Sequence, residues 1–283
     1  MTTIHLSKIA EQLDAELQGE DAVMTGSKID SRQIESGDLF IALQGENMDG
    51  HDFIGDAIDS GAIAIISNGR DIGKLSVPQI KVANPRRAAS IVAAEYYGHP
   101  TKDLIVLGIT GTNGKTTIAS LLYFILNNAG HKTAQLGTLG TIADGFNQEA
   151  TLTTPDSISL QKTFSELRDA DFSHIVMEVS SHALDQYRVA DVEFDVALFT
   201  NLTSEHLDYH ASIEAYYQAK ARLFRMLPLE STAIVNESDP NGLRMAEETN
   251  APTLTFSRSN GNSIHFSDLN ISISGIHGKI IAG

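Results

Sequence analysis

The sequence predicts an α/β protein with two domains: a small N-terminal α/β domain over residues 1–100 and a mostly parallel central domain over residues 101–283 with an antiparallel extension at its edge. Three observations support this prediction. Short apolar runs alternate with segments of helical spacing in the N-terminal part. Fully apolar strands follow from Leu104, and alternating apolar and polar residues begin beyond Ala251.

The N-terminal part contains three short apolar runs, which predict strands at residues 39–43, 62–66 and 80–82. Residues 85–97 carry apolar side chains at three-to-four spacing, which predicts a helix. Gly98 and Pro100 stop this helix, because glycine favours the backbone conformation that ends helices and proline lacks an N–H group. The domain boundary is therefore expected near residue 100.

The central part contains four fully apolar runs, at residues 104–109, 175–177, 196–199 and 233–235. Strands that are apolar on both faces are typical of a parallel, doubly wound sheet covered by helices. The tail alternates apolar with polar residues, which predicts antiparallel strands at the sheet edge; the apolar positions are Ile264, Phe266, Leu269, Ile271 and Ile273.

The composition is that of a folded, water-soluble chain, with 42% hydrophobic and 20% charged residues. The net charge of −16 argues against nucleic acid as a partner, because binding its phosphate backbone needs a surface rich in lysine and arginine. Cysteine is absent, which excludes disulfides, thiolate catalysis and cysteine-bound zinc. The sequence has neither the roughly 18 apolar residues of a membrane span nor a signal-peptide layout, so we expect a cytoplasmic protein that does not insert into membranes.

Residues 104–130 read as a buried strand, a glycine-rich loop and an amphipathic helix, the context of a phosphate-binding loop (P-loop). Gly111 and Gly114 allow the backbone N–H groups to point inward at phosphate oxygens, and the helix N-terminus adds its dipole. Lys115 would bridge the β- and γ-phosphates, while the Thr116 hydroxyl would bind the accompanying Mg²⁺. ATP or GTP binding is therefore predicted, with the loop completed by Thr112, Asn113 and Thr117.

The loop is a variant of the common P-loop pattern. The strict pattern GxxxxGK[ST] requires glycine where this chain has Ile109, and the glycines here are at positions 108, 111 and 114. A strand-to-helix turn with incidental glycines is the alternative interpretation.

The variant loop GITGTNGKTT resembles that of the Mur ligase family, which also includes folylpolyglutamate synthases. Further segments resemble the branch of the family that adds the third amino acid to the peptide of a UDP-linked peptidoglycan precursor. These segments are MEVSSHALDQYRV (177–189), FTNLTSEHLDYH (199–210), YYQAKARLF (216–224), TTPDS (153–157) and DSRQIESGDLFIALQGENMDGHDFI (30–54).

The resemblance implies metal ligands beside the nucleotide. Glu178 follows an apolar strand, where an acid is usually a surface residue, but the preceding P-loop favours binding of Mg²⁺. His206 is implied as a second ligand, with a purely structural histidine as the alternative, whereas His182 and His210 are expected to be structural. Lys220, which the sequence alone would assign to a helix surface, is implied to react with CO₂ and to bind a second Mg²⁺ as a carbamate.

The resemblance also implies substrate contacts. Thr153 and Thr154 would hold the acyl-peptide part of the substrate, while Ser180 and Arg188 would contact its carboxylate and diphosphate region; internal hydrogen bonding is the alternative for the last two. The uridine end would bind at Ser31, Arg32 and residues 47–51. A simple turn built around Asp30 explains the DSR tripeptide nearly as well.

The activity implied by the resemblance is that of an ATP-dependent amide ligase. It would activate UDP-MurNAc-L-Ala-D-Glu as an acyl phosphate and join it to a free amino acid, L-lysine or meso-diaminopimelate, using ATP, two Mg²⁺ ions and carbamylated Lys220. We expect a monomer. Family members carry a third, C-terminal domain that this chain is expected to lack, and its central domain is expected to be incomplete at its end. The alternatives are a non-catalytic fragment that binds the UDP-precursor or nucleotide, and a folylpolyglutamate synthase-like ligase.

Overall fold

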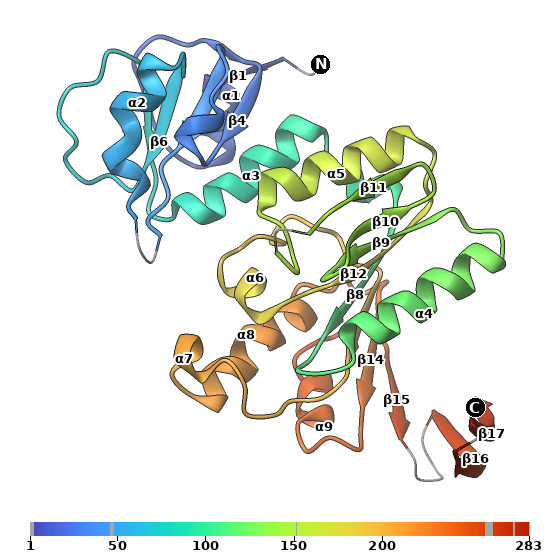
Figure 1. The fold of residues 1–283 in the computed structure, drawn as a ribbon. Helices are drawn as coiled ribbons and strands as arrows, with labels where there is room; N and C mark the ends of the chain where they lie inside the picture. Colours follow the sequence, from blue (N-terminus) through green and yellow to red (C-terminus); the bar gives the residue numbers. More distant parts are fainter. Residues whose placement is uncertain (1–2, 46–47, 151, 258–262, 274, 283) are drawn as a thin grey trace. The chain divides into compact units, whose positions relative to one another are not determined.

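The computed structural model describes residues 3–45, 48–150, 152–257, 263–273 and 275–282. The chain divides into two compact units (Figure 1). Unit 1 consists of Met1–Pro100, Asp156–Asp169 and Gln186–Val192, and unit 2 of Thr101–Pro155, Ala170–Asp185 and Glu193–Gly283. Within the described residues, no helix is long and apolar enough to cross a membrane.

Unit 1 is built around a five-stranded sheet of order β2-β7-β6-β5-β4, in which β4 to β7 run parallel and β2 is antiparallel to β7. The strands are β2 (Leu17–Gln18), β4 (Gly26–Lys28), β5 (Asp38–Ile41), β6 (Ala64–Ser67) and β7 (Gln79–Lys81), with β1 (Ile4–His5) and β3 (Val23–Met24) paired separately. The helices are α1 (Leu6–Gln12), α2 (Ile54–Asp59), α3 (Pro85–Tyr97), α5 (Ser157–Asp169) and the 3₁₀ segments η1 (Ser31–Gln33) and η2 (Gly50–Phe53). The strands and the helix predicted for this part are therefore confirmed.

Helix α3 has sequence signals at both ends. The Asn84 side chain accepts a hydrogen bond from the Arg87 N–H group, and Pro85 occupies the first turn, where no N–H partner is needed. Gly98 ends the helix in the left-handed conformation, with φ of 71°. These local signals explain why the sequence predicts this helix with its correct bounds.

The sheet of unit 1 is buried on both faces. Because side chains alternate along a strand, Leu39 and Ile41 of β5 join one apolar cluster with residues of α1 and α3, whereas Phe40 joins another with residues of α2. Ile158 of α5, which is distant in the sequence, belongs to the first cluster. Unit 1 is therefore completed by a helix from later in the chain.

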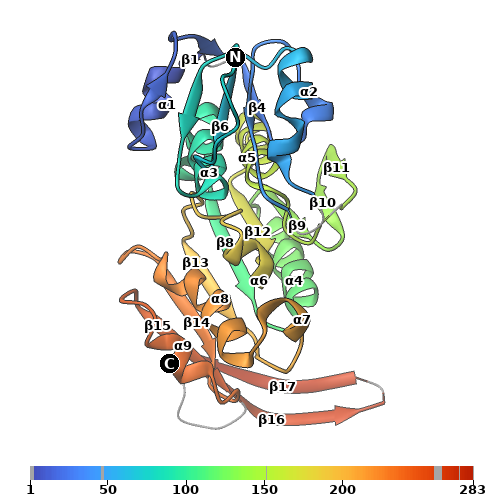
Figure 2. The same cartoon turned by 90° about the vertical axis from the view of Figure 1, so that its left-hand side faces the viewer.

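Unit 2 contains a ten-stranded sheet of order β11-β10-β9-β12-β8-β13-β14-β15-β16-β17, parallel from β9 to β16 and antiparallel at both edges (Figure 2). Its strands are β8 (Ile105–Thr110), β9 (Thr133–Gly137), β10 (Gly140–Ala143), β11 (Phe146–Gln148), β12 (His174–Glu178), β13 (Val196–Phe199), β14 (Thr232–Asn236), β15 (Thr253–Ser257), β16 (Ile264–Ser272) and β17 (Gly275–Ala282). Its helices are α4 (Lys115–Asn128), α6 (Ser181–Asp185), α7 (Leu207–His210), α8 (Ile213–Arg225) and α9 (Gly242–Ala246), and the 3₁₀ segment η3 (Pro100–Asp103) precedes β8. The mostly parallel central sheet predicted from the sequence is confirmed.

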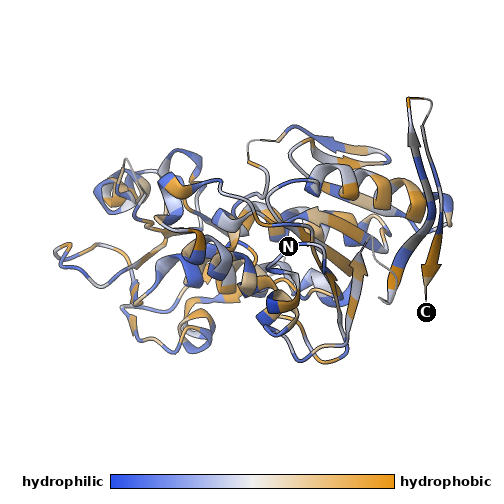
Figure 3. Cartoon of the chain, turned by 90° about the horizontal axis from the view of Figure 1, so that it is seen from below, coloured by the Kyte–Doolittle hydropathy of each residue, from blue (hydrophilic) through white to orange (hydrophobic). Residues whose placement is uncertain are grey.

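Helices pack against the central strands of this sheet, which are fully or partly buried. The strands of Figure 3 that are coloured mainly hydrophobic lie inside the molecule, away from the long hairpin that ends near the C-terminus. Helix α4 packs against β8, β9 and β12, and α8 packs against β8 from the other side of the strand in Figure 1. The tail adds an antiparallel strand at the edge, as predicted, but only β17 is antiparallel; β15 and β16 extend the parallel part. The β10–β11 hairpin at the opposite edge was not predicted, although the dipeptide Asp144-Gly145 between its strands is a typical hairpin signal.

The parallel strands bring polar residues to one edge of the sheet. β12, β8, β13 and β14 are neighbours that run in the same direction, so their carboxyl ends meet. In such sheets, ligands bind outside these carboxyl ends. This edge carries the loop between Thr110 and Lys115, Glu178 at the end of β12, and Thr200 after β13.

Candidate functional site

The predicted P-loop joins β8 to α4 in a tightly curved conformation. Gly111 has a φ of 145°, and a Cβ atom there would overlap the Thr200 hydroxyl, so only glycine fits. Gly114 is also left-handed, with φ of 89°, immediately before α4 begins. The loop is held by Asn201, whose backbone oxygen accepts from the Thr112 N–H at 2.8 Å and whose side-chain oxygen accepts from the Asn113 N–H at 3.0 Å. The sequence did not predict this supporting role of Asn201.

Lys115 lies folded back against the loop. Its Nζ donates hydrogen bonds to the Gly111 and Thr112 carbonyl oxygens at 2.9 Å and 2.8 Å. Burial lowers the pKa of Lys115, partly offset by the negative charge of Glu178. The ammonium group thus occupies the concave side of the loop, where carbonyl oxygens take the place of the phosphate oxygens it is predicted to bind.

Lys220 reaches the same carbonyl group from α8. Its Nζ donates to the Gly111 oxygen at 2.9 Å and lies 4.4 Å from the ring centre of Tyr216, and the residue is 1% exposed. Burial, and then the charge of Lys115, hold the pKa of Lys220 well below its ordinary value. The structure therefore brings Lys115 and Lys220 together, and the prediction of a surface lysine from sequence alone is wrong.

Glu178 is buried at the end of β12, with 1% of its surface exposed. Its Oε2 accepts a hydrogen bond from the Thr116 hydroxyl at 2.9 Å, and its Oε1 accepts from the Thr138 N–H at 2.9 Å. A Cβ atom on Gly137 would collide with this carboxylate, so β9 is shaped to admit it. The two proposed magnesium ligands Thr116 and Glu178 are therefore in contact, and Thr138 is a partner that the sequence analysis missed.

His206 lies at the start of α7 in the left-handed conformation, with φ of 56°, and is exposed. Its ring centre is 5.2 Å from that of His182 and 6.0 Å from that of Tyr216, the residue whose ring also contacts Lys220. Among the described residues, no group of three or more His, Asp or Glu side chains is arranged to hold a metal ion. The implied ligands Thr116 and Glu178 are thus in contact, whereas His206 and Lys220 each lie near the ring of Tyr216.

The remaining histidines nearby make structural contacts. His210 is buried, and its Nε2 is 2.9 Å from the Ser181 hydroxyl. Burial lowers the pKa of His210, and the proximity of His182 adds to this effect. The ring of His182 packs 4.1 Å from the ring centre of Tyr209.

A chain of hydroxyl groups links the predicted acyl-substrate residues to Glu178. The Thr153 hydroxyl is 3.3 Å from that of Thr138, which bonds to the Glu178 carboxylate at 3.2 Å. The Thr154 hydroxyl donates to the Glu178 carbonyl oxygen at 2.9 Å and accepts from the Ser180 N–H at 3.1 Å. The structure therefore groups Thr153, Thr154 and Ser180 around Glu178. Their hydrogen bonds are internal, in line with the alternative stated above for Ser180.

Unit 1 contains a cavity of about 660 Å³ that Ser31 and Arg32 line together with Met48, Gly50 and Arg86. Arg32 is exposed, and its guanidinium makes a two-point hydrogen bond to the Asp30 carboxylate at 2.9 Å and 2.7 Å, which lowers the pKa of that carboxyl. The Asp30-centred turn is thus present beside the cavity.

Other residues of unit 1 bear on this cavity and on the predicted substrate contacts. Arg86 at the start of α3 is a cationic lining residue that the sequence analysis did not single out. Arg188 also belongs to unit 1, where its Nε and Nη2 donate to Gln186. Asn47 of the predicted uridine-binding segment lies outside the described residues.

Comparison with known proteins identifies the family. The Mur ligase middle domain matches residues 109–282, and the Mur ligase family catalytic domain matches residues 23–97. The chain is 41% identical over 262 residues to the UDP-N-acetylmuramoyl-L-alanyl-D-glutamate–2,6-diaminopimelate ligase of Geobacter metallireducens, covering 90% of this chain and 51% of the relative. It is 42% identical over 231 residues to the ligase of the same name from Halalkalibacterium halodurans, covering 81% of this chain and 47% of the relative.

A solved structure supports the same relationship. The structure of a UDP-N-acetylmuramoyl-L-alanyl-D-glutamate–2,6-diaminopimelate ligase superimposes with a TM-score of 0.85 at 26% identity, covering 99% of this chain and 58% of that chain. The chain spans about half the length of the curated relatives that it matches. On the family matches and these relatives, the chain belongs to the Mur ligase family.

Proposed function

We propose that the chain takes part in the ATP-dependent ligation that adds the third amino acid, L-lysine or meso-diaminopimelate, to UDP-MurNAc-L-Ala-D-Glu. The observation that carries this proposal is the contact between the P-loop residue Thr116 and buried Glu178, next to the lysine pair at Gly111. The names of the two relatives make diaminopimelate the first acceptor to test.

ATP would bind at the curved loop of residues 111–117. The start of α4 suits phosphate oxygens, because the first N–H groups of a helix have no partner within the helix. Lys115 would exchange its two carbonyl partners for the β- and γ-phosphates, a change that replaces neutral acceptors by charged ones. When Lys115 turns to the phosphates, Lys220 would be the lysine that still donates a hydrogen bond to the Gly111 carbonyl oxygen.

Two Mg²⁺ ions would bind at the residues that the family resemblance implies as ligands. Thr116 and Glu178 would hold one ion with phosphate oxygens, because a hydroxyl and a carboxylate are the oxygen ligands that Mg²⁺ prefers. His206 and Lys220 as a carbamate would hold the second. Mg²⁺ would supply neutralisation of the phosphate charge during transfer. The remaining coordination positions of each ion would be filled by oxygens of the nucleotide.

Lys220 is suited to carbamate formation by its position. An ammonium group that is 1% exposed and faces another ammonium is costly, so the neutral amine is favoured there. The amine nitrogen would form a bond to the carbon of CO₂ and release one proton, leaving an anionic carbamate. The carbamate places a negative charge there, which attracts both Lys115 and Mg²⁺.

Different parts of the substrate would contact different sets of residues. The cavity lined by Ser31 and Arg32 would take the uridine end, and Arg188 would contact the diphosphate, so that residues 1–100 form the UDP-substrate-binding domain. Residues 101–283 would form the ATP-binding domain, where Thr153, Thr154 and Ser180 hold the acyl-peptide part. These domain roles and site residues remain predictions.

The chemistry would proceed in two steps. The side-chain carboxylate of the D-Glu residue attacks the γ-phosphorus of ATP, forming an acyl phosphate as the bond to ADP breaks. The amine of the incoming amino acid then attacks the acyl carbon, and the tetrahedral intermediate expels phosphate and loses a proton to give the amide. Lys115, with the N–H groups at the start of α4, would stabilise the negative charge that moves through both steps.

We further propose that the chain acts as a monomer in the cytoplasm, without membrane insertion or nucleic-acid binding. The net charge of −16 disfavours anionic polymers and anionic lipid surfaces, and the absence of cysteine suits a reducing compartment. Light scattering at increasing protein concentration would measure the molar mass, and a mass of twice 30.5 kDa would contradict the monomer.

The decisive experiment is phosphate release from ATP by this chain, with and without UDP-MurNAc-L-Ala-D-Glu, lysine and diaminopimelate. Release that requires the UDP-dipeptide and one amino acid would establish the ligase and name its acceptor. Binding of the UDP-dipeptide without release would support a non-catalytic protein that binds the UDP-precursor. Absence of both binding and release would contradict the proposal.

A further inference from the structure

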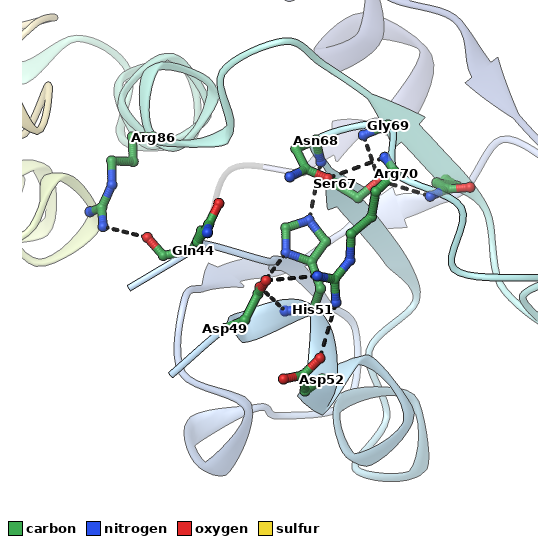
Figure 4. A network of polar contacts seen from close by, with 10 residues as sticks. Gln44, Asp49, His51, Asp52, Ser67, Asn68, Gly69, Arg70 and Arg86 are labelled. Atoms are coloured by element: carbon green, nitrogen blue, oxygen red, sulfur yellow. Dashed lines mark hydrogen bonds and ion pairs between the residues drawn. The ribbon is translucent and has the colours of Figure 1, made fainter. Parts of the chain in front are cut away.

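A polar network in unit 1 joins the end of β6 to the segment that follows Met48 (Figure 4). His51 lies at its centre, in η2, and its side chain is fully buried. Its Nδ1 lies 2.6 Å from the Asp49 carboxylate, and its Nε2 lies 3.2 Å from the backbone nitrogen of Asn68. Neither His51 nor Asn68 lines the 660 Å³ cavity, so the network stands behind the cavity wall.

The partners of His51 fix its tautomer. A backbone N–H group can only donate, so Nε2 accepts from Asn68 and carries no proton. The single proton of the neutral ring is therefore on Nδ1, which donates to Asp49. In this state the imidazole bridges the loop after β6 and the segment before η2 with one hydrogen bond on each side.

Asp49 is fixed by three donors. Its Oδ1 accepts from the His51 N–H at 2.9 Å as well as from the His51 ring, and its Oδ2 accepts from the Arg70 guanidinium at 2.7 Å. Arg70 also donates to the Asp52 carboxylate at 3.0 Å. The Arg70 guanidinium thus joins Asp49 to Asp52, three residues later. The backbone N–H of Arg70 also donates to the Asn68 side chain at 3.2 Å.

The network holds a turn that carries three lining residues of the cavity. Asp49 pairs with Gln44 in an isolated β-bridge, the Gly50 N–H donates to the Leu43 oxygen at 2.8 Å, and the Gly45 N–H donates to the Met48 oxygen at 2.9 Å. On the opposite side, Arg86 donates to the Gln44 carbonyl oxygen at 2.8 Å. The lining residues on this turn are Gly45, Met48 and Gly50.

Apolar burial cannot fix this turn. Met48 is 66% exposed, and glycines have no side chain to bury. A Cβ atom on Gly50 would lie 2.8 Å from the backbone of Leu43, so the close approach of the two segments depends on glycine and on the hydrogen bonds between them. The position of this part of the wall therefore depends on polar contacts, of which the buried His51–Asp49 pair is the most enclosed.

We propose that His51 and Arg70 are positioning residues that hold Gly45, Met48 and Gly50 in the shape that receives the uridine end of the UDP-linked precursor. The inference rests on the proposed function, because the cavity is taken as the site of that end. It predicts that changes behind the wall weaken binding of the UDP-precursor and leave nucleotide binding at the P-loop unchanged.

The test is calorimetric titration of the full chain with UDP-MurNAc-L-Ala-D-Glu and, separately, with ATP and Mg²⁺. Loss of a buried hydrogen-bonding partner in His51→Ala is expected to weaken precursor binding about 10-fold. Arg70→Gln is expected to weaken it about three-fold, because this side chain is partly exposed. His51→Asn retains a donor for Asp49 and is expected to recover part of the loss. Lys74→Gln removes the same charge from an exposed position four residues after Arg70 and serves as the matched control.

The outcomes separate the inference from the proposed function. Wild-type binding of the precursor, with equal affinity in His51→Ala and Arg70→Gln, would overturn the inference and leave the proposed function standing. Parallel loss of ATP affinity would also overturn it, because a general loss of structure moves both affinities. If His51→Ala does not fold, Arg70→Gln decides. A wild-type chain that does not bind the precursor would overturn both.

Discussion

The carbonyl oxygen of Gly111 accepts from two lysines, one from the loop and one from α8. Burial lowers the pKa of both amino groups, and for Lys220 the charge of Lys115 lowers it further. Such an arrangement contributes little to stability, since a buried charge without a counter-charge is costly. It suits the proposed site, in which Lys115 stays cationic and binds phosphate whereas Lys220 reacts as the neutral amine.

Lys115→Ala is expected to lower ligation, measured as phosphate release, by at least about 100-fold, because one phosphate-stabilising cation is lost. The free energy of unfolding, measured in urea, should change by less than about 1 kcal/mol, since the lost hydrogen bonds are to loop carbonyls. Lys162→Ala on the surface of α5 is the matched control and should retain activity. Near-normal ligation by Lys115→Ala would contradict the assigned role.

Lys220→Met is expected to abolish ligation while leaving the free energy of unfolding unchanged or higher, because an apolar side chain of similar length replaces a buried amine. Carbon-13 NMR with labelled CO₂ should show a carbamate signal in the wild-type chain that this variant lacks. A stable variant that still ligates, or a wild-type chain without the signal, would be evidence against the carbamate.

The sequence indicated which residues lie near one another at the candidate site, but not their partners. The P-loop and Glu178 follow parallel strands, whose carboxyl ends meet at one edge of the sheet, whereas Thr153, Thr154 and Ser180 were implied by the family resemblance. Thr138 was missed because its contact with Glu178 joins segments 40 residues apart, which no local pattern encodes. Tyr216 lies four residues before Lys220 on α8, so the helical spacing could have indicated their contact. Arg86 was missed because a charged residue in the first turn of a helix has no distinctive signal.

At the scale of elements, α3 illustrates how local signals specify bounds. Asn84→Ala removes the side-chain acceptor of the Arg87 N–H and is expected to cost about 1 kcal/mol of the free energy of unfolding in urea. Asn84→Asp retains an acceptor and should restore most of it. Equal stability of the alanine and aspartate variants would show that the cap contributes nothing.

His174, the first residue of β12, makes the stability of the protein sensitive to pH. Burial, and the nearby His131, lower the pKa of His174 from 6.5, so the unfolded chain binds a proton more readily than the folded one. The contribution of neutral His174 to the free energy of unfolding is therefore fully present above pH 6.5 and decreases as the pH falls below 6.5. His174→Gln should lose less stability between pH 7 and about 5 in urea titrations. If the wild-type chain and His174→Gln lost the same free energy of unfolding over this pH range, His174 would not be the cause of the pH dependence.

Local patterns specify elements, but not always their partners. Strands β8 and β13 were predicted because their residues are apolar on both faces. Helix α5 was not assigned to unit 1, because its contact with α3 depends on tertiary packing between segments about 70 residues apart. The strands of the tail alternate in sequence whether they pair parallel or antiparallel, so β15 and β16 could not be distinguished from β17.

At the scale of the whole molecule, unit 1 is assembled from three separate stretches of chain. A fragment of residues 1–100 lacks α5, whose Ile158 belongs to the apolar cluster around α3. This fragment is expected to unfold at a lower urea concentration than the same region of the full chain, monitored by hydrogen exchange, because apolar surface stays exposed. Equal protection in fragment and full chain would show that the first stretch folds independently.

The discontinuity of unit 1 also sets the order in which the chain can mature on the ribosome. Residues 156–192, which supply its last pieces, emerge only after the P-loop and the strands β8 to β11 have left the exit tunnel. Unit 1 therefore stays incomplete, with apolar residues of α3 exposed, while the first strands of unit 2 are already available to form their sheet. Synthesis from one end therefore does not finish this protein one unit at a time: unit 1 receives its last stretch, Gln186–Val192, after most of the first half of unit 2 has been made, and the last stretch of unit 2 is Glu193–Gly283.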